Sequence, residues 1–119
     1  MQEPRVRALV VEDDPALRML CRVNLELEGF AVREAATVGE AEAAIAAERP
    51  DVVLLDVNLG GEQTNDLLAN IRASGIPVAL VTGSVDIDDY RDRADAVLGK
   101  PFAPQTLVET ARRLARLDA

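Results

Sequence analysis

The sequence predicts an α/β domain in which a doubly wound, five-stranded parallel sheet carries helices on both faces. Short runs rich in Val and Leu, without polar alternation, are typical of strands buried on both faces. Helical patterns lie between these runs, and a helical crossover joins strands that run parallel. The predicted strands are Val6–Val11, Val52–Leu55, Val78–Val81 and Ala96–Leu98, with an edge strand marked by Phe30 and Val32 next to Arg33.

The first two helices have clear start signals. Asp14 is a suitable N-cap, Pro15 fits the first helical position, and Gly29 ends the first helix. Thr37 and Glu40, three residues apart, form the pattern of a capping box at the start of the second. The faces predicted to be buried are Leu17, Leu20, Cys21 and Leu25 in the first helix, and Ala41, Ala44 and Ile45 in the second.

Three further helices are expected, and one of them is marginal. The third runs from about Glu62 to Ala73 and the fifth from about Pro104 to Leu117. The fourth, Asp86–Asp95, is acidic and has few apolar residues to bury, so its stability is low. The predicted inward faces are Leu67, Leu68 and Ile71 in the third, and Leu107, Val108, Ala111, Leu114 and Ala115 in the fifth.

Composition narrows the possible functions. The 119 residues fit one domain, residues 1–119, and the net charge of −8 argues against direct binding to nucleic acid or a membrane surface. No apolar run approaches the roughly 20 residues of a membrane span, and the N-terminus lacks a signal peptide's apolar core, so we expect a cytoplasmic protein. The absence of histidine excludes catalytic triads and histidine-ligated zinc. Cys21, the one cysteine, is expected to fill the core.

Polar side chains follow four of the predicted strands at the point where each strand ends. These residues are Glu12, Asp13 and Asp14 after the first strand, Asp56 after Val52–Leu55, Thr82 after Val78–Val81, and Lys100 shortly after Ala96–Leu98. Lys100 is the only lysine, among twelve arginines, and its ammonium offers a compact point charge where arginine offers a planar fork. Ligands of such sheets bind beyond the carboxyl ends of the strands. We therefore expect a site there.

The acidic residues favour a magnesium site. Two carboxylates about 4 Å apart repel by roughly 4 kcal/mol at an effective dielectric constant near 20, so a cluster of them requires a cation. Magnesium prefers carboxylate, carbonyl and water oxygens. Each residue also has a simpler interpretation: the acidic run as residues favoured by a helix N-terminus, Asp56 as a strand-end cap, and Lys100 as a solvated surface charge. Their joint placement favours a common site.

The chain resembles the receiver domain of bacterial two-component response regulators over nearly its whole length. The motifs that carry the resemblance are Val-Val-Glu-Asp-Asp-Pro at 10–15, Leu-Leu-Asp-Val-Asn-Leu at 54–59, Val-Thr-Gly at 81–83 and Gly-Lys-Pro-Phe at 99–102. The resemblance implies a flavodoxin-like fold with strand order 2-1-3-4-5. It also implies a cis peptide bond between Lys100 and Pro101.

The resemblance further implies a role for each site residue. Asp56 is the phosphoacceptor, Asp13 is a direct Mg²⁺ ligand, Glu12 is a ligand through water, and the Asn58 carbonyl joins the metal shell. Thr82 and Lys100 bind phosphoryl oxygens. The phosphodonor is a histidine kinase or a histidine phosphotransfer protein, and the target protein is unknown.

The chain departs from the family pattern at three places. The loop Asn58-Leu59-Gly60-Gly61 replaces the proline-containing loop that is common after the phosphoacceptor. Val97 stands where most receivers have an aromatic residue, three positions before the lysine, so a switch based on ring rotation is absent. Helices three and four are short relative to the family pattern. We expect phosphorylation to act instead by changing the order of the marginal fourth helix.

Three functions compete at this stage. The first is a stand-alone receiver that catalyses only its own phosphorylation and dephosphorylation. A receiver domain taken from a longer protein would show the same sequence features. The second is a scaffold that keeps the receiver fold without using phosphorylation, which the presence of every site residue disfavours. The third is a phosphohydrolase with an aspartate nucleophile. That chemistry needs an acid two residues after the nucleophile, where this chain has Asn58.

Overall fold

Seven strands and four helices make up the described part of the chain. The computed structural model describes residues 5–83 and 90–116. In chain order the elements are β1 (Arg7–Val11), α1 (Pro15–Leu27), β2 (Ala31–Ala35), α2 (Val38–Ala47), β3 (Val52–Asp56), β4 (Asn58–Leu59), β5 (Glu62–Gln63), α3 (Asn65–Ala73), β6 (Val78–Thr82), β7 (Ala96–Gly99) and α4 (Pro104–Leu114).

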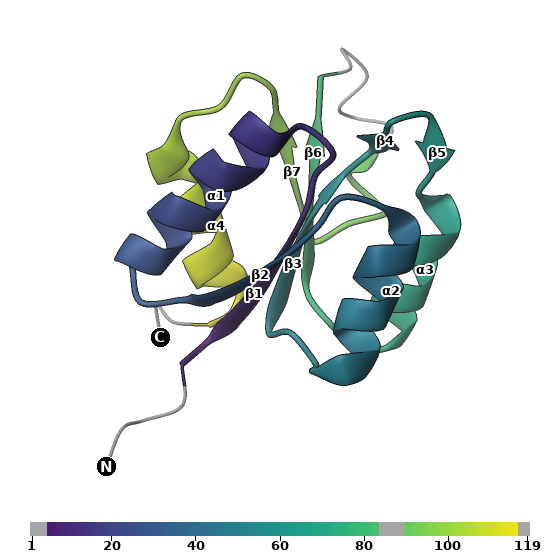
Figure 1. Ribbon diagram of the computed structural model, residues 1–119, viewed down its shortest axis with the longest axis horizontal. Coiled ribbons are helices and arrows are strands. Elements are labelled where there is room, and N and C mark those ends of the chain that lie inside the picture. The colour runs from purple at the N-terminus through teal and green to yellow at the C-terminus, as the bar shows by residue number, and fades with distance from the viewer. Residues whose placement is uncertain (1–4, 84–89, 117–119) are drawn as a thin grey trace.

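The main sheet has five parallel strands in the order β2-β1-β3-β6-β7. Helices α1 and α4 cover one face of the sheet, and α2 and α3 cover the other (Figure 1). The doubly wound α/β fold predicted from the sequence is therefore confirmed. Because β6 and β7 are the fourth and fifth strands of this sheet, the order matches the expected 2-1-3-4-5, with β2 as the predicted edge strand.

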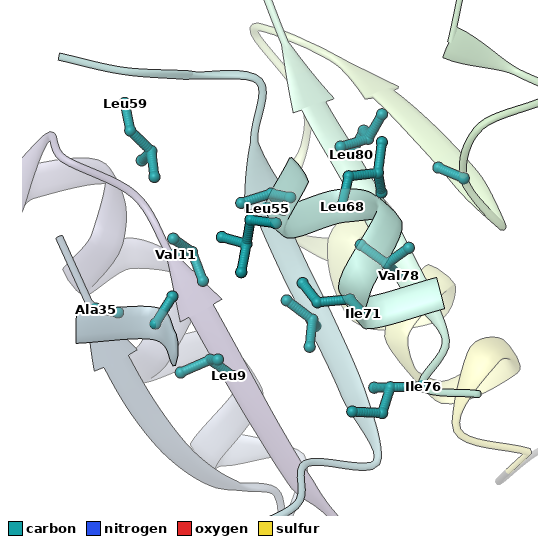
Figure 2. Packing of buried hydrophobic residues seen from close by; sticks show 14 residues of the cluster. Leu9, Val11, Ala35, Leu55, Leu59, Leu68, Ile71, Ile76, Val78 and Leu80 are labelled. Atoms are coloured by element: carbon teal, nitrogen blue, oxygen red, sulfur yellow. The ribbon is translucent and has the colours of Figure 1, made fainter. Parts of the chain in front are cut away.

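The apolar runs lack alternation because each central strand contributes to two cores. In β3, Val53 and Leu55 pack toward α2 and α3, while Val52 and Leu54 pack toward α1 and α4. All five residues of β3 and of β6 are buried. Figure 2 shows the first of these clusters, in which α3 places Leu68 and Ile71 over the sheet. Burial on both faces thus holds the central strands and fixes where they end.

Both predicted helix starts are present. The Asp14 carboxylate accepts hydrogen bonds from the main-chain N–H groups of Ala16 and Leu17, and Pro15 opens α1. The Thr37 hydroxyl accepts from Glu40 N at 3.0 Å. The Glu40 carboxylate accepts from Ala36 N at 2.8 Å, one residue before the N-cap. Each cap satisfies N–H groups that have no partner inside the helix.

The predicted buried face of α1 is only partly correct. Cys21 and Leu25 are buried, and Leu17 is half-buried. Leu20, however, is 41% exposed, and it lies on an exposed apolar surface of α1. This surface consists of Met19, Leu20, Val23 and Leu27. The helix meets the sheet along a narrower stripe than its leucine pattern indicates.

A short hairpin replaces the expected first turn of the third helix. Residues 58–59 and 62–63 form β4 and β5, which pair antiparallel, so α3 begins at Asn65 instead of Glu62. The connecting residues, Gly60 and Gly61, have φ angles of +57° and +91°, as a two-residue hairpin turn of the type I′ class requires. Glycine adopts these angles without a Cβ clash.

The C-terminal part of the chain confirms the last helix and its inward face. Leu107, Val108 and Ala111 of α4 are buried, and Leu114 and Ala115 pack against the same cluster. Of the fourth helix expected over Asp86–Asp95, residues 86–89 lie outside the described residues, and residues 90–95 form turns and bends instead of an α-helix, because this acidic segment has few apolar residues to bury. Within 5–83 and 90–116, no helix has the length and apolar content needed to cross a membrane.

Core packing predicts how stability responds to truncation. Leu55 in β3 has no exposed surface, whereas Leu27 in α1 is 78% exposed. We expect Leu55→Ala to lower the free energy of unfolding by about 3 kcal/mol, because it leaves a cavity. The matched control Leu27→Ala should change it by less than about 0.5 kcal/mol. Urea denaturation followed by circular dichroism measures both, and equal effects would contradict the assigned core.

Candidate functional site

The carboxyl ends of the central strands meet at one edge of the sheet. Val11 of β1 pairs with Leu55 of β3, and Asp56 pairs with Val81 of β6. Glu12 follows Val11, so it lies beside Asp56 on the neighbouring strand. The fold therefore brings the first and second acidic segments together, as the sequence predicted.

Lys100 connects these two segments. Its Nζ lies 3.0 Å from Asp56 Oδ2 and 3.0 Å from Glu12 Oε1. The Glu12 and Asp56 side chains are 5% and 6% exposed, while the lysine side chain is 28% exposed. One ammonium thus pairs with two nearly buried carboxylates. The pairing with Glu12 was not predicted, because it depends on where the sheet places the end of β7 relative to the end of β1.

Asp13 completes an acidic cluster that faces the solvent. Carboxylate oxygens of Glu12, Asp13 and Asp56 lie within 4.8 Å of one another, and Asp13 is exposed while the other two are buried. The single lysine leaves this cluster with excess negative charge. Three carboxylates, of which Asp13 is open to water, fit the oxygen ligands and partial hydration that Mg²⁺ prefers. These residues suit the divalent cation that the sequence analysis predicted.

The hairpin after β3 packs against this acidic cluster. Asn58 N donates to Asp56 Oδ1 at 2.9 Å, and Gly61 N donates to Asn58 Oδ1 at 3.1 Å. A Cβ at Gly60 would lie 3.5 Å from Asp13 Oδ2, so the turn closely approaches an acidic side chain. Sequence analysis identified this segment as a loop but did not predict the hairpin, although two adjacent glycines between short strands are a hairpin signal.

Thr82 lies at the same edge and is 3% exposed. It pairs with Gly99 in the sheet, and its carbonyl oxygen accepts a hydrogen bond from Lys100 N at 2.7 Å. The Lys100–Pro101 peptide bond is cis, as expected. The structure therefore places all the predicted site residues at the carboxyl edge of the sheet, with Asn58 at the start of the hairpin.

Burial and charge shift the pKa values of two of these groups. Burial raises the pKa of Glu12 to about 7, and its contact with Asp56 adds to the rise. Burial lowers the pKa of Lys100, but hydrogen bonds and charges from Asp56 and Glu12 outweigh it, and the net pKa is raised. The ammonium therefore remains protonated, while Glu12 is close to half-protonated at neutral pH when no metal is bound.

Cys21 lies below the site and behaves as predicted. Its side chain is buried, and burial followed by the charge of Glu12 raises the pKa of the thiol to about 11. A thiol with that pKa is protonated at neutral pH and is a poor nucleophile. Cys21 is therefore part of the core, as the sequence analysis predicted.

A cluster of carboxylates and one lysine at the carboxyl edge of a doubly wound sheet places the chain among the flavodoxin-like α/β proteins. Residues 8–112 match the family of the response regulator receiver domain. The chain belongs to this family.

Relatives and solved structures agree with this assignment. The chain is 39% identical over 125 residues to the DNA-binding response regulator MtrA of Mycolicibacterium smegmatis, covering 98% of this chain and 53% of that protein. It is 31% identical to the transcriptional regulator RpaA of Synechocystis, covering 92% of this chain and 49% of that protein. The chain thus spans about half the length of these relatives.

Two solved receiver domains match over almost their full length. A CheY-like receiver domain protein from Methanospirillum hungatei has a TM-score of 0.86 and 30% identity, with 96% of each chain covered. The receiver domain of NtrX from Brucella abortus has a TM-score of 0.84 and 30% identity, covering 92% of this chain and 98% of that one. The two-component signalling family is therefore shown by sequence and by structure.

The raised pKa of Glu12 predicts a pH-dependent stability. A carboxyl whose pKa rises from 4.5 to about 7 on folding stabilises the folded state below pH 4.5, and this contribution disappears as the pH rises through 7. Without metal, the free energy of unfolding should fall by about 2 kcal/mol between pH 5 and 8 relative to Glu12→Gln. Urea denaturation in EDTA at several pH values measures this difference, and parallel curves for the two proteins would refute it.

Proposed function

We propose that this chain is a phosphoacceptor receiver that takes a phosphoryl group onto Asp56 and signals by contact with another protein. The observation that carries the proposal is the pairing of the nearly buried Asp56 carboxylate with Lys100, at 3.0 Å, inside an acidic cluster. The receiver family membership supports it. The donor is a histidine kinase or a histidine phosphotransfer protein, and the reaction takes place in the cytoplasm.

The two oxygens of Asp56 have different partners. Oδ1 accepts from Asn58 N, and Oδ2 accepts from Lys100 Nζ. These contacts orient the carboxylate at the mouth of the site. In the transfer, one carboxylate oxygen forms a bond to phosphorus in line with the donor's P–N bond, which breaks and leaves its electron pair on the imidazole nitrogen.

Electrostatic stabilisation is the main contribution that this site makes to transfer. The phosphoryl group carries negative charge on its equatorial oxygens, and Lys100 supplies one positive charge at that position. The Thr82 hydroxyl is proposed to bind another of these oxygens. Asp13, Asp56 and the Asn58 carbonyl, with Glu12 through water, would hold Mg²⁺, which would supply further positive charge.

The residue two positions after Asp56 supports a receiver over a phosphohydrolase. Asn58 occupies that position, and its side-chain amide oxygen accepts from Gly61 N. An amide cannot protonate a leaving group as a carboxylic acid does. We therefore propose that the chain catalyses its own phosphorylation and dephosphorylation and does not turn over external phosphate esters.

Protein partners fit the exposed surface better than DNA does. The exposed apolar surface of α1 begins at Met19, in the second turn after the Asp14 cap, and its Leu20 lines a hollow together with Asp14 and Lys100. Apolar surface next to a reactive group suits a protein partner that must reach Asp56. The net charge of −8 disfavours direct contact with DNA. The DNA-binding relatives extend well beyond the length that this chain matches.

The phosphoacceptor assignment is tested with a small acyl-phosphate donor and Mg²⁺. The protein should gain one phosphoryl group, seen by intact-protein mass spectrometry, and Asp56→Asn should gain none, because the amide is not a nucleophile for phosphorus. Equal labelling of Asp56→Asn would reject Asp56. No labelling of the parent protein, from either the small donor or a histidine kinase, would favour the phosphorylation-independent scaffold.

Lys100 should not tolerate replacement by arginine. Its Nζ sits between two carboxylates at 3.0 Å each, and a planar guanidinium is too large for a position that holds one ammonium. Lys100→Arg should lower the phosphorylation rate at least roughly tenfold, the size expected when a preorganised charge is displaced. Arg112→Lys on α4, where Arg112 pairs with Glu28, is the matched control and should leave the rate unchanged. A normal rate in Lys100→Arg would contradict the role given to the ammonium.

A further inference from the structure

Arg18 joins the turn that carries the acidic pair to the edge strand β2. Its Nη1 donates to the main-chain carbonyl oxygen of Glu12 at 2.9 Å, and its Nε donates to Glu34 Oε1 at 3.2 Å. Glu34 belongs to β2, and the arginine side chain is 21% exposed. One guanidinium therefore holds the end of β1 and the end of β2 at the same time.

The N–H group, the carboxylate and the carbonyl oxygen of Glu12 all have polar partners. Its N–H donates to Ala35 O at 2.9 Å, and its carboxylate accepts from Asp14 N at 3.1 Å and pairs with Lys100. The carbonyl oxygen is held only through the Arg18 contact among the hydrogen bonds described above. That carbonyl belongs to the peptide plane between Glu12 and Asp13, so its direction sets the direction in which the Asp13 backbone starts.

Arg22, one turn later on α1, makes a contrasting set of contacts. Its Nε lies 3.2 Å from Glu34 Oε2 without hydrogen-bond geometry, and its Nη1 donates to Glu26 at 3.3 Å. Both arginines therefore pair with Glu34, but only Arg18 hydrogen-bonds the turn of the acidic pair. This difference separates a positioning role from a general effect of surface charge.

We propose that Arg18 is a positioning residue that holds the Glu12–Asp13 peptide in the orientation from which the acidic pair binds a divalent cation. The proposal rests on the proposed function, because the cation is the Mg²⁺ of the phosphoacceptor site. Arg18 acts through two hydrogen bonds from one rigid plane, which link Glu34 to the Glu12 carbonyl. Groups that orient metal ligands in this way affect affinity without touching the metal.

The test compares Arg18→Gln, Arg18→Lys and Arg22→Gln with the parent protein. Mg²⁺ dissociation constants come from isothermal titration calorimetry, and thermal unfolding confirms that each variant is folded. We expect roughly tenfold weaker Mg²⁺ binding for Arg18→Gln. Arg18→Lys should be weakened similarly, because one ammonium keeps the charge but loses the planar pair of donors. Arg22→Gln should bind Mg²⁺ like the parent.

A second readout needs no metal. In EDTA, the amide hydrogens of Glu12 and Asp14 should exchange faster in both Arg18 variants than in the parent, while Arg22→Gln leaves them unchanged. Parent-like affinity and exchange in Arg18→Lys would overturn the proposal, because charge alone would then suffice. Equal losses in Arg22→Gln and Arg18→Gln would also overturn it, because the surface ion pairs would then be responsible.

The two proposals fail separately. If the parent protein takes no phosphoryl group, the proposed function fails. Amide exchange in the metal-free variants still tests the positioning role of Arg18. If the parent is phosphorylated and Arg18→Gln matches it in Mg²⁺ affinity and in exchange, only the positioning role fails.

Discussion

The rest of the site depends on one buried charge contact, in which Lys100 pairs with Glu12 and Asp56. Two carboxylates that are almost fully removed from water carry a large desolvation cost, and a partner charge at 3.0 Å offsets much of it. The ammonium lowers that cost without cancelling the negative charge of the cluster, since Asp13 adds a third carboxylate. The remaining negative charge is what a divalent cation can use. The carboxylates that would bind a cation are therefore also the groups whose burial is costly to the folded state. The raised pKa of Glu12 reflects this cost, because burial and the neighbouring Asp56 disfavour its charged form.

The sheet provides the rigidity that such a contact requires. Strands β1, β3 and β6 are buried on both faces, so their register can slip only by exposing apolar side chains to water and placing polar ones in a core. Their carboxyl ends are therefore held at fixed relative positions. Local contacts then refine the site: the hairpin directs Asn58 N at Asp56, and Arg18 of α1 holds the Glu12 carbonyl.

Much of the fold was predictable because its signals are local. The strand runs, the Asp14 cap and the buried pair Leu67 and Leu68 depend on nearby residues, and the structure confirms them. The hairpin was missed because its short strands resemble the first turn of a helix, and only the paired positive φ angles of Gly60 and Gly61 make the turn. Leu20 was wrongly assigned to the core. A helical pattern shows which residues share a face, but the area that the sheet covers on that face is a property of packing.

The sequence alone determined the chemical inventory of this protein: the acidic residues, the threonine and the single lysine, each placed after a strand whose end is set by local hydrophobicity. Tertiary structure decided which of these groups touch. Lys100 contacts Glu12 as well as Asp56, and Arg18 joins two strand ends. The residues in each of these contacts are far apart in the sequence. Spacing along the chain does not encode such distances, because strand order and register set them. The residues that carry the chemistry are therefore visible in the sequence, whereas their pairing and pKa values arise only when the sheet brings them together.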